Sequence, residues 1–261
     1  MNKLINEIQL NRIYQRDCIE GMKMLPDDSI NLIIADPPYN TGNKGTKIDM
    51  KKEYGYNYFN QKWDKIDDFG LFNLLWITEC YRVLKPGGSI LSYGTHHNLF
   101  TVGYLMEETG FKIKIKYEWK KKNPPPAFAG RTPRFSTESI IWGIKGKAPV
   151  YNHGYARKIN NGINITNVFE TALTPKSEKA HGKFPCQKPL EISIKLINLH
   201  SRENDIVLIP FGGSGTECVA AEVSNRNFIA FETEPSYIEL ANMRLDSTTQ
   251  YKDKFKSILD C

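Results

Sequence analysis

The tetrapeptide Asp36-Pro37-Pro38-Tyr39 places an acid, two prolines and an aromatic ring directly after the apolar run 32–35. That run is apolar at every position, as is typical of a strand buried on both faces of a parallel sheet. Neither proline has a backbone N–H to donate, so we expect the strand to end in a stiff turn. The turn would hold a carboxylate, backbone carbonyls and an aromatic wall at the carboxyl end of a strand, where open α/β sheets bind their ligands.

These groups suit a planar ligand that carries an amino group. The amine would donate to the Asp36 side chain and to the backbone carbonyls, and the ring of the ligand would stack on Tyr39. The alternative is a turn that only ends a strand, because consecutive prolines are common in such turns. The four residues alone favour that alternative, and the rest of the chain has to decide.

A second stretch, 207–216, is predicted to be a strand that runs into a glycine-rich turn and a helix. A phosphate P-loop is excluded, because it needs Lys after the last glycine, where this chain has Thr216 and Glu217. The third glycine of a dinucleotide fingerprint is absent, and an acid at the helix start would repel a pyrophosphate. Glu232 ends the next predicted strand, 17 residues after Gly215, where an acid can accept from both ribose hydroxyls.

This stretch therefore favours a ligand that has a nucleoside but no phosphate. S-adenosylmethionine fits, because its sulfonium tolerates nearby acids. A glycine turn that serves only packing is the alternative. The residues predicted to bind the cofactor from this reasoning are Gly213, Ser214, Gly215 and Glu232.

The chain has 261 residues and a net charge of +6, and the charge is unevenly distributed. Between Lys112 and Lys147 there are ten Lys or Arg and two acids, so this segment carries +8 and the rest of the chain 6 − 8 = −2. A basic stripe on a nearly neutral body is typical of a nucleic-acid binder. A solvated basic face is the equal alternative.

Several classes of protein are not favoured by the composition. No apolar stretch is long enough for a membrane span, and the N-terminus does not resemble a signal peptide. The five cysteines are scattered and form no CxxC pair, which argues against a zinc site or a disulfide framework and favours a reducing cytoplasm. His96 and His97 have no third ligand at a matching spacing, so we expect no metal.

Strands and helices alternate along the chain, which predicts a single α/β domain, 1–261, with a mainly parallel twisted sheet. Two segments are predicted to lie outside its core: a mobile loop, 41–62, and an insertion, 148–183. A strand at 111–119 is expected to pair with 139–144 as an antiparallel edge hairpin. The other strands are expected at 11–16, 32–35, 89–93, 205–208 and 227–231. Helices are expected at 19–25, 69–84, 98–108, 189–200, 217–224 and 234–245, and the helix 234–245 is expected to be the last one.

The motifs, taken in this order, resemble the β group of amino DNA methyltransferases, in which the catalytic tetrapeptide precedes the cofactor loop. The resemblance spans Asp17 to Leu245. It implies a Rossmann-like S-adenosylmethionine-dependent methyltransferase fold with a permuted order of motifs. Besides Asp36-Pro37-Pro38-Tyr39 and Phe211-Gly212-Gly213-Ser214-Gly215-Thr216, the matching stretches are Asp17-Cys18, Trp63-Asp64, 84–89, 119–126, 138–145 and 185–190.

The resemblance implies transfer of a methyl group from S-adenosylmethionine to the N6 amine of adenine in DNA, with the base flipped out of the duplex. The implied catalytic residues are Asp36, Pro37, Pro38 and Tyr39. The implied cofactor-binding residues are Asp17, Cys18, Asp36, Lys188, Phe211, Gly213, Ser214, Gly215, Thr216 and Glu232. The residues expected to contact DNA are Lys120, Lys121, Asn123, Arg131 and Arg134, with a recognition role for 148–183.

DNA is the expected partner, with a cognate restriction endonuclease as a further one, in the cytoplasm of a bacterial, archaeal or phage host cell and as a monomer or homodimer. Three alternatives stay open: N4-cytosine methylation in the same pocket, a DNA-binding module that has lost activity, and a small-molecule or RNA methyltransferase. The chain departs from the family pattern at Ile209, where the family usually has Asp, and at Phe184 and Cys186, which replace His and Thr.

Overall fold

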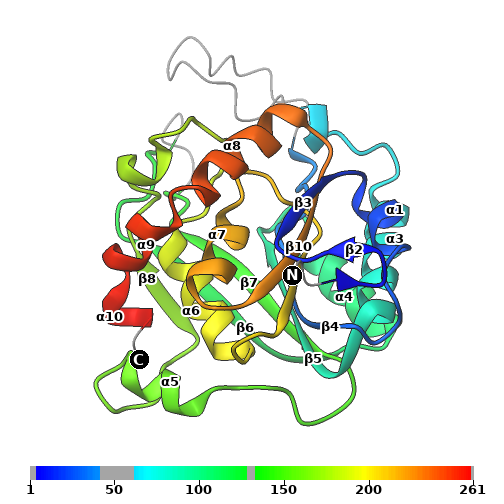
Figure 1. Ribbon diagram of the computed structural model, residues 1–261, viewed down its shortest axis with the longest axis horizontal. Coiled ribbons are helices and arrows are strands. Elements are labelled where there is room, and N and C mark those ends of the chain that lie inside the picture. The colour runs from blue at the N-terminus through cyan, green and yellow to red at the C-terminus, as the bar shows by residue number, and fades with distance from the viewer. Residues whose placement is uncertain (1–3, 42–61, 128–132, 260–261) are drawn as a thin grey trace.

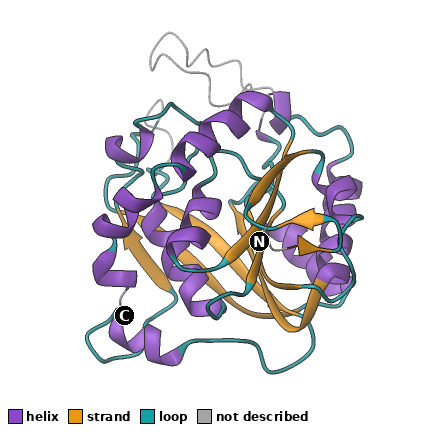
Figure 2. Cartoon of the chain, in the orientation of Figure 1, coloured by secondary structure: helices purple, strands orange, loops and turns teal. Residues whose placement is uncertain are grey.

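The computed structural model describes residues 4–41, 62–127 and 133–259. Its core is one eight-stranded sheet with helices on both faces (Figures 1 and 2). In spatial order the strands are β3 (Arg12–Gln15), β10 (Asn227–Glu232), β9 (Ile206–Ile209), β4 (Ile30–Ala35), β5 (Leu84–Gly94), β7 (Thr137–Ile144), β6 (Lys112–Lys121) and β8 (Val168–Thr171). A separate small hairpin pairs β1 (Leu4–Ile5) with β2 (Ile8–Gln9).

The five strands from β3 to β5 are mutually parallel, and β7 is antiparallel to both of its neighbours. The predicted α/β fold with a mainly parallel sheet is thus confirmed. The helices are α1 (Cys18–Met22), α3 (Phe69–Val83), α4 (Leu99–Thr109), α5 (His153–Lys158), α6 (Leu190–His200), α7 (Thr216–Val223), α8 (Pro235–Leu245), α9 (Thr248–Lys254) and α10 (Lys256–Leu259), with short 3₁₀ turns at Lys62–Asp64 and Lys176–Lys179.

Alternate residues of the central strands belong to two separate hydrophobic cores. In β4, Leu32 and Ile34 lie in the core that α6 and α7 cover, whereas Ile33 and Ala35 lie in the core that α1, α3 and α4 cover. This explains why the strand is apolar at every position. All four side chains are fully buried, so the end of β4 is a rigid base for the turn that follows.

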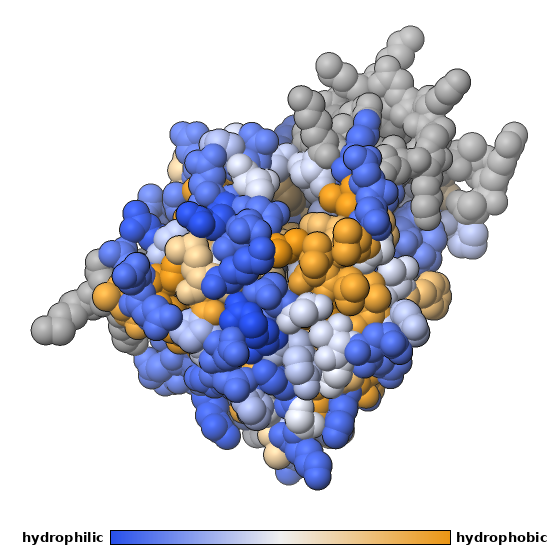
Figure 3. Space-filling model, turned by 90° about the vertical axis from the view of Figure 1, so that its right-hand side faces the viewer, coloured by the Kyte–Doolittle hydropathy of each residue, from blue (hydrophilic) through white to orange (hydrophobic). Residues whose placement is uncertain are grey.

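The helical spacing of Phe72, Leu75, Trp76, Cys80 and Val83 predicts a buried apolar stripe on α3, and the structure departs from it. Trp76, Cys80 and Val83 are buried as expected, but Leu75 is 43% exposed, and Asn73 is buried instead. Asn73 is tolerated there because its amide oxygen accepts the indole N–H of Trp76. The exposed apolar side chains of α3 and α4 lie on the side of the molecule that carries the orange patch in Figure 3; they are Leu71, Leu74, Leu75, Phe100 and Tyr104.

Three other predictions about the fold are wrong. The insertion does not lie outside the core, because β8 pairs with β6 and Phe169 is buried. The predicted hairpin does form, since β6 and β7 pair antiparallel, but β8 and not the hairpin is the sheet edge. The strand expected to start at Ser89 already begins at Leu84, because Leu84 pairs with Ile30 of β4. The helix 234–245 is not the last one, since α9 and α10 follow α8. The predicted loop 41–62 lies almost wholly outside the described residues.

Candidate active site

The Asp36-Pro37-Pro38-Tyr39 turn leaves the carboxyl end of β4, as expected from its prolines. The Tyr39 hydroxyl donates to Oδ1 of Asp36 at 2.7 Å, so the aromatic ring and the acid are directly coupled. Asp64 holds the turn from outside, accepting the backbone N–H groups of Tyr39 at 2.7 Å and of Asn40 and Thr41 at 2.8 Å. Sequence reasoning noted Asp64 only as a family match and gave it no role.

A chain of four alternating charges extends from this turn into the protein. The Lys188 ammonium lies 2.8 Å from Oδ2 of Asp36 and 3.2 Å from Oε2 of Glu138, and Oε1 of Glu138 lies 2.7 Å from the Lys121 ammonium. Each member comes from a different element: the end of β4, the start of α6, β7 and β6. The site residue Glu138 was missed by sequence reasoning, which placed it in a matching stretch without a function.

The electrostatics of these groups follow from burial and from their partners. Burial raises the pKa of Asp36, and the charge of Lys188 opposes that shift. Burial would also lower the pKa of Lys188, but Asp36 and Glu138 outweigh it, so this pKa lies well above its ordinary value. Glu138 is buried too, yet Lys188 and Lys121 lower its pKa below the ordinary value. Burial, and then the Asp36 charge, raise the pKa of the Tyr39 hydroxyl well above its usual range.

The glycine-rich turn leaves the carboxyl end of β9, the strand next to β4. Because β4 and β9 are parallel neighbours, with Leu32 opposite Val207, the two turns emerge side by side at one edge of the sheet. Gly213 and Gly215 both have left-handed backbones, with φ of 48° and 72°. Oε2 of Glu232 accepts the N–H of Gly213 at 2.7 Å, so the predicted acid does lie beside the glycine turn.

The hydroxyl groups of this turn face the protein. The Arg244 guanidinium donates to Oγ of Ser214 at 3.0 Å and to Oγ1 of Thr216 at 2.9 Å. The predicted cofactor roles of Ser214 and Thr216 therefore have to rest on their backbones. Phe211 packs edge-on against Trp76, with ring centroids 5.5 Å apart. Arg244, which is 1% exposed, was also missed, because arginine on a helix is usually expected at the surface.

Asp17 and Cys18 lie where the edge strand β3 ends, next to Glu232. The backbone N–H of Arg16 donates to the Glu232 carbonyl at 3.0 Å. Asp17 caps α1, accepting the N–H groups of Ile19 at 2.9 Å and Glu20 at 3.2 Å. Cys18 is buried, and burial raises the pKa of its thiol. The predicted cofactor residues of three strand ends are thus brought together at one edge.

The residues predicted to contact DNA do not form one set. The prediction that Lys121 contacts DNA is wrong, because its side chain is buried and paired with Glu138. Lys120 is exposed and lies 3.3 Å from a carboxylate oxygen of Glu170. Asn123 is exposed and accepts the backbone N–H of Leu173 at 2.8 Å. Arg134 is also exposed, with its guanidinium bound to the carbonyls of Pro124 and Pro125. The fifth residue, Arg131, lies outside the described residues.

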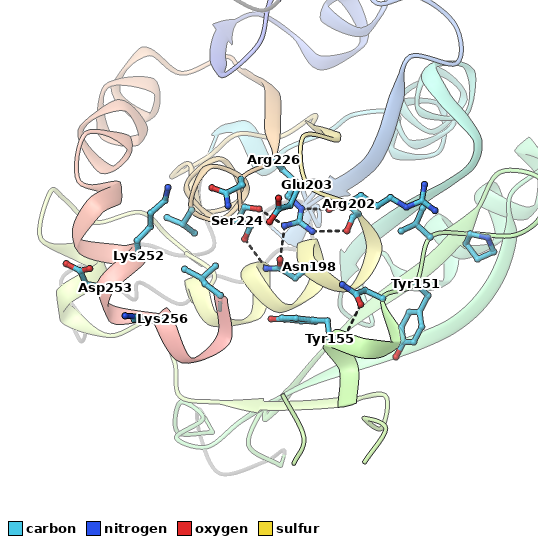
Figure 4. A pocket seen from close by; sticks show the side chains of 17 residues that line it. Tyr151, Tyr155, Asn198, Arg202, Glu203, Ser224, Arg226, Lys252, Asp253 and Lys256 are labelled. Carbon is cyan, nitrogen blue, oxygen red and sulfur yellow. Dashed lines mark hydrogen bonds between the residues drawn. The ribbon is translucent and has the colours of Figure 1, made fainter. Parts of the chain in front are cut away.

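One cavity, of about 770 Å³, lies away from this site. It opens at the amino ends of β9 and β10, between the ends of α6 and α7, α5 and the C-terminal helices (Figure 4). Its buried cation, Arg226, donates to Oδ1 of Asn198, to the carbonyl of Ser224 and to both oxygens of Ser201. Arg226 therefore holds two helix ends together. A second cavity, of about 450 Å³, is lined by His96 and 133–137.

In the part of the chain that the structure describes, no group of three or more His, Cys, Asp or Glu side chains could hold a metal ion. None of the described helices is long and apolar enough to cross a membrane.

Comparison with known proteins finds DNA methyltransferases that match most of the chain. A DNA methylase family model matches residues 30–243. The type II methyltransferase M2.MboI of Moraxella bovis is 38% identical over 250 residues, covering 94% of this chain and 91% of the relative. For M.HinfI of Haemophilus influenzae the identity is 34% over 255 residues, with coverage of 94% and 70%.

Solved structures agree with the fold. The crystal structure of the M1.HpyAVI–SAM complex superposes with a TM-score of 0.67 at 29% identity, covering 90% of this chain and 98% of that one. The cytosine-N4-specific PvuII DNA methyltransferase reaches 0.71 at 20% identity, covering 95% and 92%. The family model and these relatives show that this chain, whose Asp36-Pro37-Pro38-Tyr39 turn and glycine turn lie side by side at the carboxyl ends of β4 and β9, belongs to the N6/N4 DNA methylase family.

Proposed function

We propose that the protein transfers a methyl group from S-adenosylmethionine to the N6 amine of adenine in DNA. The observation that carries the proposal is the pairing of β4 with β9, which sets the Asp36 carboxylate next to the glycine turn. A donor bound at the turn would therefore have its reacting end close to an amine held by Asp36. Family membership supports the reaction class, and the acid at the start of the tetrapeptide supports adenine.

The residues around the glycine turn fit the nucleoside end of the cofactor. Glu232 offers a carboxylate at a strand end, beside the Gly213 N–H. A side chain at position 213 would lie 2.9 Å from the Phe184 ring, so a glycine keeps this turn open. Acids at Asp17, Glu217 and Glu232 would repel a phosphate but suit a cationic sulfonium. When bound, S-adenosylmethionine supplies a methyl group on sulfur that the lone pair of an amine can displace.

The chain's own residues would prepare that amine. An exocyclic amine of adenine is a poor nucleophile because its lone pair is delocalised into the ring. Hydrogen bonds from its two N–H groups to Asp36 and to the Pro37 carbonyl would favour tetrahedral nitrogen and localise the lone pair. These acceptors are fixed by the rigid turn, so positioning and electrostatics supply much of the rate. Asp36 is the candidate acceptor for the proton released afterwards.

The target base cannot reach this turn from inside a duplex, so it has to be flipped out. Tyr39 would stack on the extruded ring, because its hydroxyl already holds it beside Asp36. Residues 148–183, which add β8 beside the basic strand β6, are proposed to take part in DNA recognition. The names of the type II relatives support a cognate restriction endonuclease as a partner of this protein, and sequencing the neighbouring genes would test it.

Asp36→Ala is the decisive variant. We expect at least a hundredfold loss of turnover with cofactor and DNA binding nearly unchanged, because the lost contact forms fully only in the transition state. Tritium transfer from labelled cofactor to DNA measures turnover, and mass spectrometry identifies the methylated nucleoside. Recovery of N4-methylcytosine would replace the substrate but keep the mechanism. Near-normal turnover in Asp36→Ala would rule out the mechanism.

A further inference from the structure

The charge chain Asp36–Lys188–Glu138–Lys121 is unusual because most of it is inaccessible. The side chains of Lys188, Lys121 and Glu138 are 3%, 8% and 13% exposed, whereas Asp36 is 23% exposed. A target amine can therefore reach Asp36 but not the charges behind it. Two cations and two anions sum to zero, so these four side chains together carry no net charge in a buried setting where a lone charge would be costly.

All three donors of the Lys188 ammonium have partners within this group of side chains or on Tyr39. Its ammonium contacts Oδ2 of Asp36 and Oε2 of Glu138, and it lies 3.4 Å from the Tyr39 hydroxyl. Its charge also faces the rings of Tyr39 and Tyr93, at 5.5 and 5.2 Å from the centroids. An ammonium has three donors, and two carboxylates with a hydroxyl satisfy them. A carboxylate of the cofactor would have to displace one of these partners.

Other described ionisable groups also face Asp36. Glu138 on β7 and Glu217 on α7 disfavour its carboxylate form, whereas the Tyr39 hydroxyl favours it by donating a hydrogen bond; Tyr93 on β5 and Cys186 also lie close to Asp36. Glu217 is buried, and burial and then the Asp36 charge raise its own pKa. Among the described residues, Lys188 is the cation in contact with Asp36, and Lys121 reaches it only through Glu138. The Lys188 ammonium, helped by the hydrogen bond from Tyr39, therefore favours the ionised form of Asp36.

We propose that Lys188, anchored by Glu138 and Lys121, is a positioning residue that keeps the Asp36 carboxylate ionised and aimed at the target amine, instead of binding the carboxylate of the cofactor. The inference rests on the proposed function, since it assigns Asp36 to the amine. Glu138 and Lys121 act one step further away: Glu138 compensates the buried ammonium, and Lys121 compensates Glu138.

Lys188→Met tests the assignment through pH. Without the ammonium, Asp36 should hold its proton to higher pH, so the acidic limb of the kcat profile should rise by at least one pH unit. Turnover at pH 7 should fall at least tenfold and recover partly at pH 9. Calorimetry with S-adenosylmethionine should give a Kd within threefold of the wild type. Lys188→Arg, which keeps the charge, should restore the limb.

Glu138→Gln supplies a test of opposite sign. It removes an anion that disfavours ionised Asp36, so the acidic limb should move to lower pH while the plateau falls only a few fold. A purely structural role would lower turnover at every pH in both variants without moving the limb. Lys195→Met is the matched control, because Lys195 lies on α6, the helix that begins just after Lys188, and pairs with an acid, Glu191, at 2.6 Å. It should change neither the limb nor Kd.

The outcomes separate the inference from the function. If the wild-type enzyme does not methylate DNA, the proposed function fails. If it does, and Lys188→Met weakens cofactor binding tenfold without moving the limb, Lys188 binds the cofactor and the inference is overturned. Thermal melting checks that each variant folds. Should Lys188→Met not fold, an unmoved or upward limb in Glu138→Gln would overturn the inference by itself.

Discussion

The carboxylate of Asp64 accepts the backbone N–H of Tyr39 at 2.7 Å, across 25 residues of sequence. The same carboxylate accepts two further N–H groups, those of Asn40 and Thr41, at 2.8 Å each. Because the prolines before Tyr39 have no N–H to donate, Asp64 is what fixes the second half of the turn. It thereby sets the direction of the Tyr39 ring relative to Asp36.

We expect Asp64→Ala to lower turnover at least tenfold while cofactor affinity stays within threefold. Each buried N–H left without an acceptor costs about 1–3 kcal/mol, so the turn would rearrange. Asp67→Ala is the control, because Asp67 is a nearby exposed acid. Steady-state tritium transfer measures both variants. Equal turnover in the two would show that the turn needs no external support.

Tyr39 separates stacking from hydrogen bonding. From the sequence alone, Tyr39→Phe should be mild, because stacking needs only the ring. The structure changes that expectation, since the hydroxyl donates to Asp36 at 2.7 Å, and a hydrogen bond to a charged group contributes about 1.5–3 kcal/mol. We therefore expect Tyr39→Phe to lower turnover about tenfold without weakening base capture.

Tyr39→Ala should in addition lose about 1–3 kcal/mol of stacking on the extruded base. Fluorescence of 2-aminopurine at the target position reports that capture, and it should fall in Tyr39→Ala but not in Tyr39→Phe. Equal fluorescence in both variants would mean that the ring does not stack on the base.

Glu232 is expected to dominate affinity for the cofactor. In the structure its Oε1 accepts the N–H groups of Thr233 at 2.8 Å and Glu234 at 2.9 Å, while Oε2 faces Gly213. Glu232→Ala should weaken binding of S-adenosylmethionine at least tenfold by calorimetry, and Glu232→Gln by less. Unchanged affinity in both would remove the ribose assignment.

Gly215→Val is no clean test of the cofactor loop, although the sequence suggests it. A Cβ at position 215 would lie 2.6 Å from the Cβ of Ala241, so the variant would disturb the packing of α8 before it reached any ligand. Glu222→Gln on α7 is a better control for the Glu232 variants. It is a partly buried acid away from the turn, and affinity should not change.

The two turns were predictable from the sequence because their chemistry is local. Prolines directly after Asp36 and glycines before Thr216 dictate backbone shape within a few residues. The charge chain was not predictable in the same way, because its members lie on four elements. Lys121 nevertheless left a signal: alternation along β6 puts it on the same face as Tyr117 and Trp119, which are both buried. Because Lys121 belongs to the basic stripe, it was predicted to lie on the surface with the other cations.

The edge of the sheet left a weaker signal. β8 has only four residues, Val168–Thr171, and lies in a polar segment without clear periodicity. Its pairing with β6 stabilises it, including a hydrogen bond from the Trp119 indole to the Thr171 hydroxyl at 2.7 Å. A strand that depends on such a distant partner cannot be recognised from its own residues.

His200 should make stability sensitive to acid. It is buried, its Nε2 lies 3.2 Å from the Tyr117 hydroxyl, and burial lowers its pKa to about 3. Because the unfolded chain binds the proton near pH 6.5 and the folded one does not, stability is lost as pH falls below 6.5. At pH 5 the loss is about 2 kcal/mol relative to pH 7.

His200→Phe should remove that part of the pH dependence while keeping a ring against Trp142. Urea unfolding of both proteins at pH 7 and pH 5 measures it. The drop in unfolding free energy between the two pH values should be smaller in the variant by about 2 kcal/mol. An equal drop in both proteins would mean that His200 is protonated in the folded state.

The salt dependence of DNA binding distinguishes surface cations from buried ones. Lys120 and Arg134 are exposed, so neutralising either to Gln should flatten the slope of log affinity against log salt by about 1, if each contacts a phosphate. Lys121→Gln should leave the slope unchanged, because Lys121 is buried against Glu138. Lys23→Gln, just after the end of α1, is the exposed control. Fluorescence anisotropy between 50 and about 300 mM salt measures all four slopes. Unchanged slopes for Lys120 and Arg134 would make the basic stripe a solvated face, and a flattened slope for Lys121 would return it to the DNA interface.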